Sequence, residues 1–282
     1  MSTEVWGLVL TAAVVHALWN FAARKAAGDA AVIWLSVAVG TLVAILLCAY
    51  TWWQGTPLTL SWRGGLCLVA TGIIHGLYFA LLAEAYEHGE ISLVYPVARG
   101  SGVGITALAA WLALGEDISL LGAGGIALVL LGIFCLGAPA LKHQTRGLQL
   151  ALGVGLTIAC YSLVDKIGVG YVQPRYYITG MWVISTLVCT PWVVRRYGAG
   201  LLTTARVRWQ TIALIGVASL GTYLLILYAY TQGPVGYIVA VRESSVVLGA
   251  LLGWYFLQER LTPLKVTGIL AIVGGLVLIK AS

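Results

Sequence analysis

A series of ten apolar segments, separated by short polar connectors, constrains this chain more than any other feature of its sequence. A bilayer has a hydrocarbon core of about 30 Å, which a helix of about 20 apolar residues crosses. Of the 282 residues, 60% are hydrophobic and only 9% are charged, whereas soluble domains carry about 25% charged residues. We therefore predict an all-α integral membrane protein that crosses the cell (plasma or inner) membrane many times. The ten transmembrane helices are expected at residues 5–23, 31–53, 64–86, 91–114, 119–138, 148–168, 175–194, 210–231, 235–257 and 264–280.

Several classes of function are excluded by what the sequence lacks. The net charge of +6 comes from residues scattered at segment ends, so no basic stripe indicates nucleic-acid binding. The five cysteines lie inside apolar runs, where we interpret them as reduced packing residues rather than disulfides or metal ligands. Neither a nucleophile–base constellation nor a metal motif or nucleotide-binding loop is present. We therefore predict no catalytic residue, no metal site and no cofactor.

An internal repeat organises the chain. AYEHG at 85–89 parallels AYTQG at 229–233, and LGEDISLLGAGGIALVLLG at 114–132 parallels LQERLTPLKVTGILAIVGG at 257–275. The two predicted units are residues 1–141 and 142–282, with five spans each. Because the number of spans in each unit is odd, the two units must lie in opposite orientations. Inverted repeats of this kind are typical of transporters whose binding site lies near the bilayer midplane.

The distribution of Lys and Arg predicts an orientation. The side of the termini carries Arg63, Lys166, Arg175 and Lys280, and the other side carries Arg24, Lys25, Lys142, Arg146, Arg195, Arg196, Arg206, Arg208, Arg260 and Lys265. The positive-inside rule then places the termini outside the cell. The segment 195–208 between the seventh and eighth spans is expected to form a short interfacial helix.

Arg99 and Arg242 lie two turns into the fourth and ninth spans, in matching positions of the repeat. A charge at membrane depth costs about 3 kcal/mol on insertion scales, so each needs a partner, a cavity or a ligand. Arginine near a helix N-terminus suits a carboxylate or phosphate, which its planar fork binds bidentately. The alternative is that each arginine pairs with Glu84, Glu243 or a carbonyl and only locks helices together.

Glu243 follows Arg242 directly, and adjacent helical side chains point about 100° apart, so the two do not face each other. Glu243 is therefore either the partner of Arg99 across the repeat or a carrier of protons. These alternatives stay open at the level of sequence.

Other polar and aromatic residues fall on shared helix faces. His16, Trp19 and Asn20 are spaced i, i+3, i+4, and Tyr161 and Asp165 are spaced i, i+4. For His16 the alternative is ordinary packing, and for Asp165 it is a position at the membrane edge. The complete set of candidate substrate-binding residues is His16, Trp19, Asn20, His75, Tyr78, Tyr95, Arg99, Tyr161, Asp165, Tyr223, Arg242 and Glu243. The second, fifth, seventh and tenth spans carry few such residues and are predicted to be scaffold.

The two copies of the pattern GED-x-SLLGAGGIALVLLG and QERLTPLKVTGILAIVGG resemble the EamA-type domain of the drug/metabolite transporter superfamily. HALWN at 16–20, YPVARG at 95–100 and VRESS at 241–245 are similar to segments of bacterial members. The resemblance covers essentially the whole chain and implies ten helices, a central cavity between inverted halves, and alternating access. It also implies cytoplasmic termini, which conflicts with the charge count, so the orientation is left open.

The leading hypothesis is a secondary transporter that exports small anionic or zwitterionic solutes such as amino acids. Arg99 and Arg242 would bind the charged group, and tyrosines would hold an apolar portion. Proton coupling through Glu243, Asp165 or His16 and exchange without a coupled ion are both allowed. The alternative is a lipid-handling or structural membrane protein whose intramembrane arginines are locked in ion pairs. The solute, the direction, the coupling ion and the oligomeric state are not decided by the sequence.

Overall fold

The computed structural model describes residues 1–23, 29–137, 145–258 and 260–282. Arg24, Lys25 and Lys142, which enter the charge count, lie outside the described residues, as does residue 138 at the end of the fifth predicted span. The described residues form helices α1 (Thr3–Ala23), α2 (Ala30–Trp53), α3 (Trp62–His88), α4 (Ile91–Leu114), α5 (Leu120–Gly137), α6 (Thr145–Gly168), α7 (Pro174–Tyr197), α8 (Gly200–Val207), α9 (Trp209–Gln232), α10 (Val235–Arg242), α11 (Ser244–Leu257) and α12 (Pro263–Ala281). No strand occurs among them, and the prediction of an all-α fold is confirmed.

The described chain has ten spans long and apolar enough to cross a membrane, and α10 and α11 together make the ninth. Local chemistry sets several helix starts. Asp29 accepts hydrogen bonds from Ala31 N (3.1 Å) and Val32 N (3.3 Å) at the start of α2, and Ser61 caps α3 in the same way. The predicted interfacial helix is α8, which is shorter than the segment expected and has no buried residue.

The ninth span differs from its prediction because it is broken at its centre. Glu243 separates α10 from α11. Its N–H donates to Ala240 O (3.1 Å) and its carbonyl accepts from Val246 N (2.9 Å), so both bonds span three residues instead of four. Such a tightened turn inside a helix often marks a functional position, and here it lies beside Arg242.

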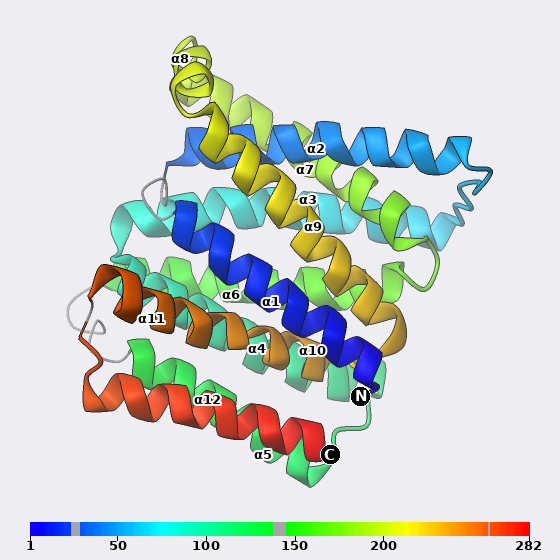
Figure 1. Ribbon diagram of the computed structural model, residues 1–282. Coiled ribbons are helices and arrows are strands. Elements are labelled where there is room, and N and C mark those ends of the chain that lie inside the picture. The colour runs from blue at the N-terminus through cyan, green and yellow to red at the C-terminus, as the bar shows by residue number, and fades with distance from the viewer. Residues whose placement is uncertain (24–28, 138–144, 259) are drawn as a thin grey trace.

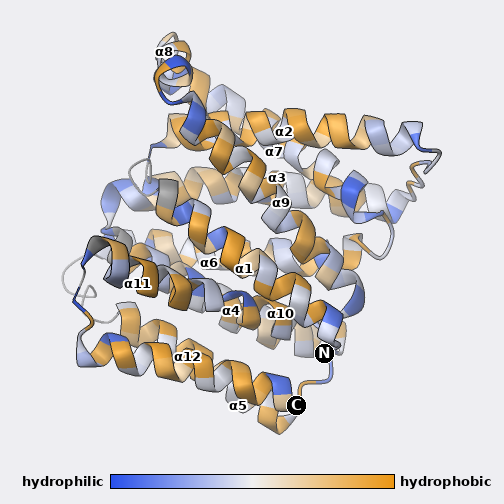
Figure 2. Cartoon of the chain, in the orientation of Figure 1, coloured by the Kyte–Doolittle hydropathy of each residue, from blue (hydrophilic) through white to orange (hydrophobic). Residues whose placement is uncertain are grey.

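The helices run roughly side by side, with both termini at one end of the bundle and α8 at the other (Figure 1). We call these the terminal end and the α8 end. Apolar residues cover the middle of the helices, and hydrophilic residues gather towards the two ends and around α8 (Figure 2). Exposed tryptophans at helix ends, among them Trp52, Trp53 and Trp62, fit an interfacial aromatic belt.

Helices α5 and α12 form a tightly packed pair at one side of the bundle (Figure 1). A Cβ on Gly125 would lie 2.7 Å from Gly275 O, and one on Gly132 would lie 2.6 Å from Gly268 O. Close backbone approach through small residues is the usual way in which membrane helices associate. These two helices contribute no residue to the cavity described below, which agrees with the scaffold role predicted for the fifth and tenth spans.

Candidate functional site

A partly open cavity of about 240 Å³ lies at the centre of the bundle. Side chains from α1, α2, α3, α4, α6, α7, α9 and α10 line it. Ten of the twelve predicted site residues are among them: His16, Trp19, Asn20, His75, Tyr78, Tyr95, Arg99, Tyr161, Tyr223 and Arg242. The other two, Asp165 and Glu243, lie behind the wall and contact residues that line it.

The cavity extends from the midplane towards the α8 end. On that side its lining reaches Asn20 and Tyr86, which lie three and two residues from the ends of α1 and α3. On the terminal side its lining reaches no further than Tyr161, Met181 and Ile226, which lie seven, seven and six residues from the ends of α6, α7 and α9 on that side. At 1.5 Å per residue, this leaves about 9–10 Å of packed protein at the terminal end. The structure is therefore closed at the terminal end and more open at the α8 end.

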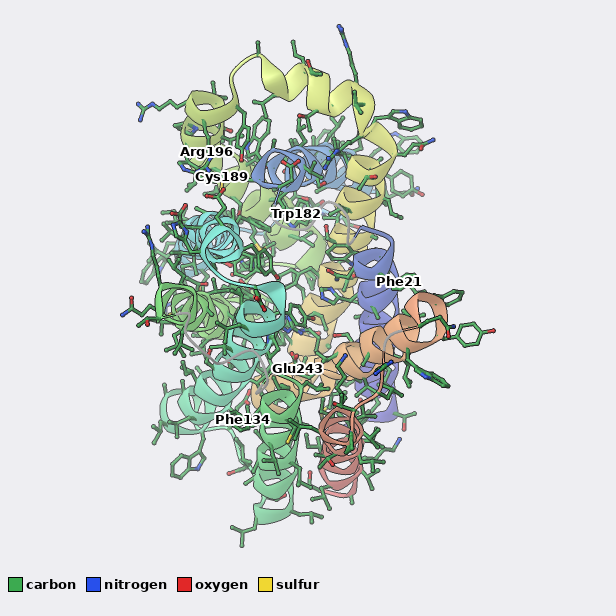
Figure 3. All side chains as sticks on the ribbon, turned by 90° about the vertical axis from the view of Figure 1, so that its left-hand side faces the viewer. Phe21, Phe134, Trp182, Cys189, Arg196 and Glu243 are labelled. Atoms are coloured by element: carbon green, nitrogen blue, oxygen red, sulfur yellow. The ribbon has the colours of Figure 1, made fainter. Side chains whose placement is uncertain are left out.

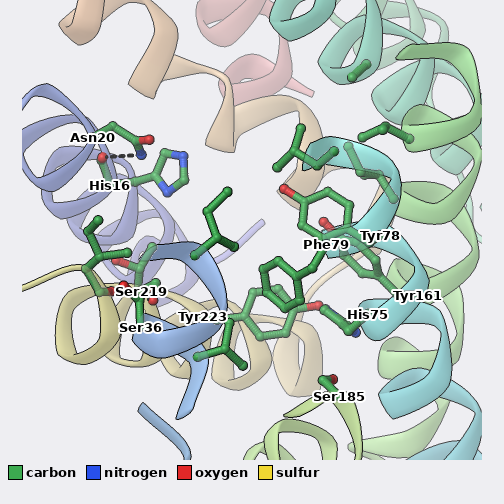
Figure 4. Close-up of a pocket in the computed structure, with 18 of the residues that line it drawn as sticks. His16, Asn20, Ser36, His75, Tyr78, Phe79, Tyr161, Ser185, Ser219 and Tyr223 are labelled. Carbon is green, nitrogen blue, oxygen red and sulfur yellow. Dashed lines mark hydrogen bonds between the residues drawn. The ribbon is translucent and has the colours of Figure 1, made fainter. Parts of the chain in front are cut away.

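The cavity has a polar wall and an aromatic wall. Figure 4 shows His16, Asn20, Ser36 and Ser219 on one side and Tyr78, Phe79, Tyr161 and His75 on the other. Asn20 Nδ2 donates to His16 O (2.8 Å). The residues of the polar wall belong to α1 (His16, Asn20), α2 (Ser36) and α9 (Ser219).

The aromatic wall is a set of contacting rings. His75 stacks on Tyr161 with 4.1 Å between ring centroids and meets Tyr223 edge-on at 5.3 Å. Tyr78 meets Tyr161 edge-on at 5.7 Å. Such contacts stabilise a wall built from long side chains and hold its rings in place.

Arg99 contacts the cavity but its guanidinium is paired. Its Nη2 lies 2.6 Å from Glu243 Oε1, and its Nε donates to Glu243 Oε2 at 3.0 Å. Glu243 is fully buried, and the view from the α8 end places it between helices of the bundle (Figure 3). Of the two alternatives weighed for Glu243, the ion pair with Arg99 is present in this structure. It joins the fourth span to the break in the ninth.

Arg242 lines the same cavity and is only 5% exposed, yet it makes no hydrogen bond or ion pair with any described residue. Its Nε is fully buried without a partner. The indole Nε1 of Trp19, another residue of the lining, is also buried and unpartnered. Buried donors are satisfied in the great majority of native structures, so unpartnered donors facing a cavity indicate a place where an acceptor binds.

The closed terminal end is held by hydrogen bonds between distant parts of the chain. Glu116, between α4 and α5, accepts from Val235 N (2.7 Å) and Gly236 N (3.1 Å) at the start of α10. A carboxylate is favoured there by the partial positive charge of the helix N-terminus. Ser119 N donates to Tyr237 Oη (3.1 Å) nearby. These bonds fix the helix that carries Arg242.

Asp165 lies under the aromatic wall and is fully buried. It accepts hydrogen bonds from Tyr177 Oη (2.9 Å) and from the hydroxyl of Tyr223. The neighbouring Lys166 points elsewhere, and its Nζ donates to Tyr230 O and Gly233 O, both at 2.7 Å. Asp165 is therefore buried inside the protein, three residues before the end of α6.

Two helices that the sequence assigned to the scaffold, α2 and α7, also line the cavity, so that prediction is wrong for them. They contribute Ile33, Ser36 and Val37, and Met181, Trp182 and Ser185. The serine hydroxyls bond to carbonyls of their own helices, which hides their polarity inside apolar spans. Trp182 offered a signal, because it lies in the middle of its span and not in the interfacial belt.

Glu84, Glu87 and His88 bring ligand atoms close enough together to hold a metal ion, but at the surface. Arg196 Nη2 binds both Glu87 oxygens (2.7 and 2.9 Å), and Arg146 lies 3.7 Å from Glu84. Because cations of the chain engage these carboxylates, the cluster is an ion-pair group, and we assign no metal to it.

Comparisons with known proteins agree with this architecture. The sequence matches the EamA-like transporter family over residues 5–138 and 145–281. An uncharacterized transporter of Bacillus subtilis (strain 168), YwfM, is 26% identical over 141 residues, which are 50% of this chain and 47% of that protein. The chain thus spans about half the length of this curated relative. A solved crystal structure, described only as that of a protein, is similar over 100% of this chain and 98% of its own, with a TM-score of 0.77. At 16% identity that likeness shows the fold alone.

Proposed function

The chain belongs to the EamA-like transporter family, and on this premise we propose that it is a secondary transporter exporting small zwitterionic or anionic solutes such as amino acids. It is a multi-pass membrane transporter rather than an enzyme. The cell (plasma or inner) membrane is the location that we propose for it, in agreement with its similarity to a bacterial transporter.

The observation that carries the proposal is the unpaired Arg242 in a central cavity. A guanidinium that is nearly buried and unpaired favours an anionic guest, because the guest supplies the missing charge and acceptors. The aromatic wall offers an apolar surface at the same time. The cavity of about 240 Å³ is smaller than the ~300–1,000 Å³ typical of sites for drug-sized ligands. A carboxylate-bearing molecule of amino-acid size fits this combination.

Alternating access is the mechanism that we propose for this site. The two halves, 1–141 and 142–282, would rock about the cavity as inverted repeats. One observation supports the repeat: α4 is followed by Gly115 (φ 65°) and α11 by Gln258 (φ 56°), matching positions of the repeat in the same left-handed conformation. The closed terminal end and the more open α8 end would then be one of two states.

The alternative, a lipid-handling or structural protein with locked arginines, fits only half of the site. Arg99 is locked to Glu243, as that alternative expects. Arg242 is not locked, and the cavity beside it has polar as well as aromatic side chains. Arg242 therefore favours transport.

Flux through proteoliposomes tests the proposal. Purified protein would be reconstituted and loaded in turn with radiolabelled amino acids and small organic anions, and release would be compared with that from protein-free vesicles. For a transported solute, Arg242→Ala should raise the half-saturation concentration about tenfold to a hundredfold, because a hydrogen bond to a charged group contributes about 1.5–3 kcal/mol.

Arg206→Ala is the matched control, since it removes an exposed arginine of α8 that does not touch the cavity. Its flux should equal that of the wild type. If no solute in the panel moves, or if Arg242→Ala leaves every transported solute unaffected, the proposed binding role is wrong.

A further inference from the structure

We propose that Asp165 is a proton-binding site that couples the protonation state of the chain to the closure beneath the cavity. The proposal rests on the function proposed above, because it assigns the coupling ion of that transporter. The carboxylate belongs to a group of side chains that we call the Asp165 cluster: Thr71, Asp165, Tyr177 and Tyr223.

The first step concerns the charge of Asp165. The carboxylate is fully buried, and no described Lys, Arg or His lies within ion-pair distance of it. The ammonium group of the adjacent Lys166 donates to two backbone carbonyls instead. An intramembrane carboxylate held only by hydroxyl groups is expensive in its charged form, and such residues mark proton pathways in pumps and transporters.

The second step concerns access from the cavity. The ring of Tyr223 lines the cavity, and its hydroxyl donates directly to Asp165. His75 lines the cavity as well, and its Nδ1 lies 3.1 Å from Thr71 Oγ1, which also faces Asp165. Two short chains of exchangeable protons therefore connect the cavity with the carboxylate. A proton from cavity water would bind the carboxylate and later return to water at the other membrane face, so no further reactant is needed.

The third step concerns what the proton changes. The ionised carboxylate accepts from Tyr177 on α7 and Tyr223 on α9, and so ties α6 to both helices. Protonation turns one carboxylate oxygen into a donor, so the tyrosine hydroxyl bonded to that oxygen must turn to accept or its hydrogen bond weakens. This junction lies between the cavity and the terminal end. Proton binding would thus loosen the closure at the floor of the cavity.

Other groups act on this site from the helices around it. Those that interact with Asp165 are Cys67 on α3, Tyr177 on α7, Tyr223 and Tyr230 on α9, and Arg242 on α10. His75 on α3 is connected to it through Thr71, Tyr161 precedes it by one turn of α6, and the ammonium group of Lys166 points away. On α4 the nearest cation, Arg99, is paired with Glu243. Among the described residues of these surroundings, Arg242 is thus the cation that has neither an ion pair nor a hydrogen bond, because Lys166 donates to backbone carbonyls. A solute anion bound to Arg242 would neutralise the positive charge that stabilises the ionised carboxylate of Asp165. The protonated form of Asp165 would then be favoured, so the binding of solute and the binding of a proton would be linked.

Infrared difference spectroscopy of the full chain in membranes tests the proton site, with pH as the only variable. The wild type should show a carbonyl-stretch band of a buried protonated carboxyl group that appears as the pH falls. Asp165→Asn should lose the band. Tyr228→Phe, which removes a hydroxyl from another face of α9, should keep the band at the same midpoint.

Tyr223→Phe keeps the test decisive if Asp165→Asn fails to fold. Loss of one hydroxyl donor to the carboxylate should move the midpoint to higher pH by about one to two units. A band that is absent in the wild type, persists in Asp165→Asn, or keeps its midpoint in Tyr223→Phe would overturn the proposal.

A second experiment separates this proposal from the proposed function. Proteoliposomes containing a pH dye would receive an equimolar mixture of the twenty standard L-amino acids outside. Amino-acid exchange with a change in luminal pH that Asp165→Asn abolishes supports coupling. Amino-acid exchange by the wild type without any pH change would contradict proton coupling but would still support the proposed transport function. Absence of amino-acid movement counts against the proposed solutes, while the infrared titration still decides whether Asp165 binds a proton.

Discussion

Arg99 and Arg242 hold matching positions in the two halves of the sequence but have different surroundings in the structure. Arg99 is engaged by Glu243 through two contacts of 2.6 and 3.0 Å. Arg242, next to that carboxylate in the chain, has no partner among the described residues and faces the cavity. The break between α10 and α11 explains the difference, because Glu243 lies in the tightened turn and reaches across to α4 while Arg242 points to the solute space.

This contrast separates two uses of an intramembrane charge. A paired arginine joins two helices and contributes to stability only while its partner is present. An unpaired arginine destabilises the ligand-free structure, and it is retained where a bound ligand supplies the missing negative charge. Equivalent places in a repeat therefore need not have equivalent roles.

The largest effect is expected from breaking the pair. Glu243→Ala leaves the Arg99 guanidinium buried without a counter-ion, and the free energy of unfolding should fall by about 3–5 kcal/mol. Denaturant unfolding in detergent micelles measures it.

The double variant Arg99→Met, Glu243→Met provides the control, since removing both charges leaves no uncompensated ion. It should recover most of the lost stability, because apolar replacement of a buried pair is often neutral or favourable. A double variant as unstable as Glu243→Ala would show that Arg99 and Glu243 act separately.

Arg242→Met should change the free energy of unfolding in the opposite direction, if it changes it at all. Removing an unpaired intramembrane charge should leave the free energy of unfolding unchanged or raise it by up to about 3 kcal/mol. The same unfolding assay, run beside Arg99→Met, makes the comparison direct. Equal destabilisation by the two substitutions would mean that Arg242 has a structural partner and is not the free binding group.

Most of the fold follows from the sequence, because the bilayer limits the choice of structure. Long apolar runs require helices of membrane length, and the ends predicted at 91–114 coincide with those of α4. The break at Glu243 could not be predicted in the same way. VGYIVAVRESSVV reads as a continuous helix, and only the contact with Arg99 reveals why the turn at Glu243 tightens.

The candidate site was predictable where polar residues interrupt apolar helices. His16, Trp19 and Asn20 share the face that lines the cavity. Which arginine is free could not be read from the sequence, since that depends on the direction of Glu243 across 144 residues of separation. Met181 and Ile33 also escaped notice, because an apolar residue facing a cavity looks like one facing another helix.

Glu116→Gln tests the support of the free arginine. The substitution removes the charge that accepts from Val235 N and Gly236 N at the start of α10. A loss of about 1–2 kcal/mol is expected there, so hydrogen exchange of these two amides should become about tenfold faster.

The matched control for this exchange experiment is within the same molecule. The amides of Ala31 and Val32, capped by Asp29 at the start of α2, should exchange as in the wild type. The Arg99–Glu243 pair should also persist, so the thermal stability should fall much less than in Glu243→Ala. Unchanged exchange at Val235 and Gly236 would mean that Glu116 does not hold α10.

The smallest effect is expected from Arg196→Ala, which provides a third kind of arginine for the comparison. Arg196 Nη2 contacts Glu87 at 2.7 Å, as close as the buried pair, but both side chains are partly exposed at the α8 end. Water screens the attraction within this pair and can solvate Glu87 once Arg196 is removed. The free energy of unfolding should therefore fall by less than about 1 kcal/mol. Unfolding at low and at high salt measures it, and the small difference should disappear at high salt. A loss approaching that of Glu243→Ala would mean that the short contact distance, rather than burial, sets the contribution of the arginine pairs in this chain.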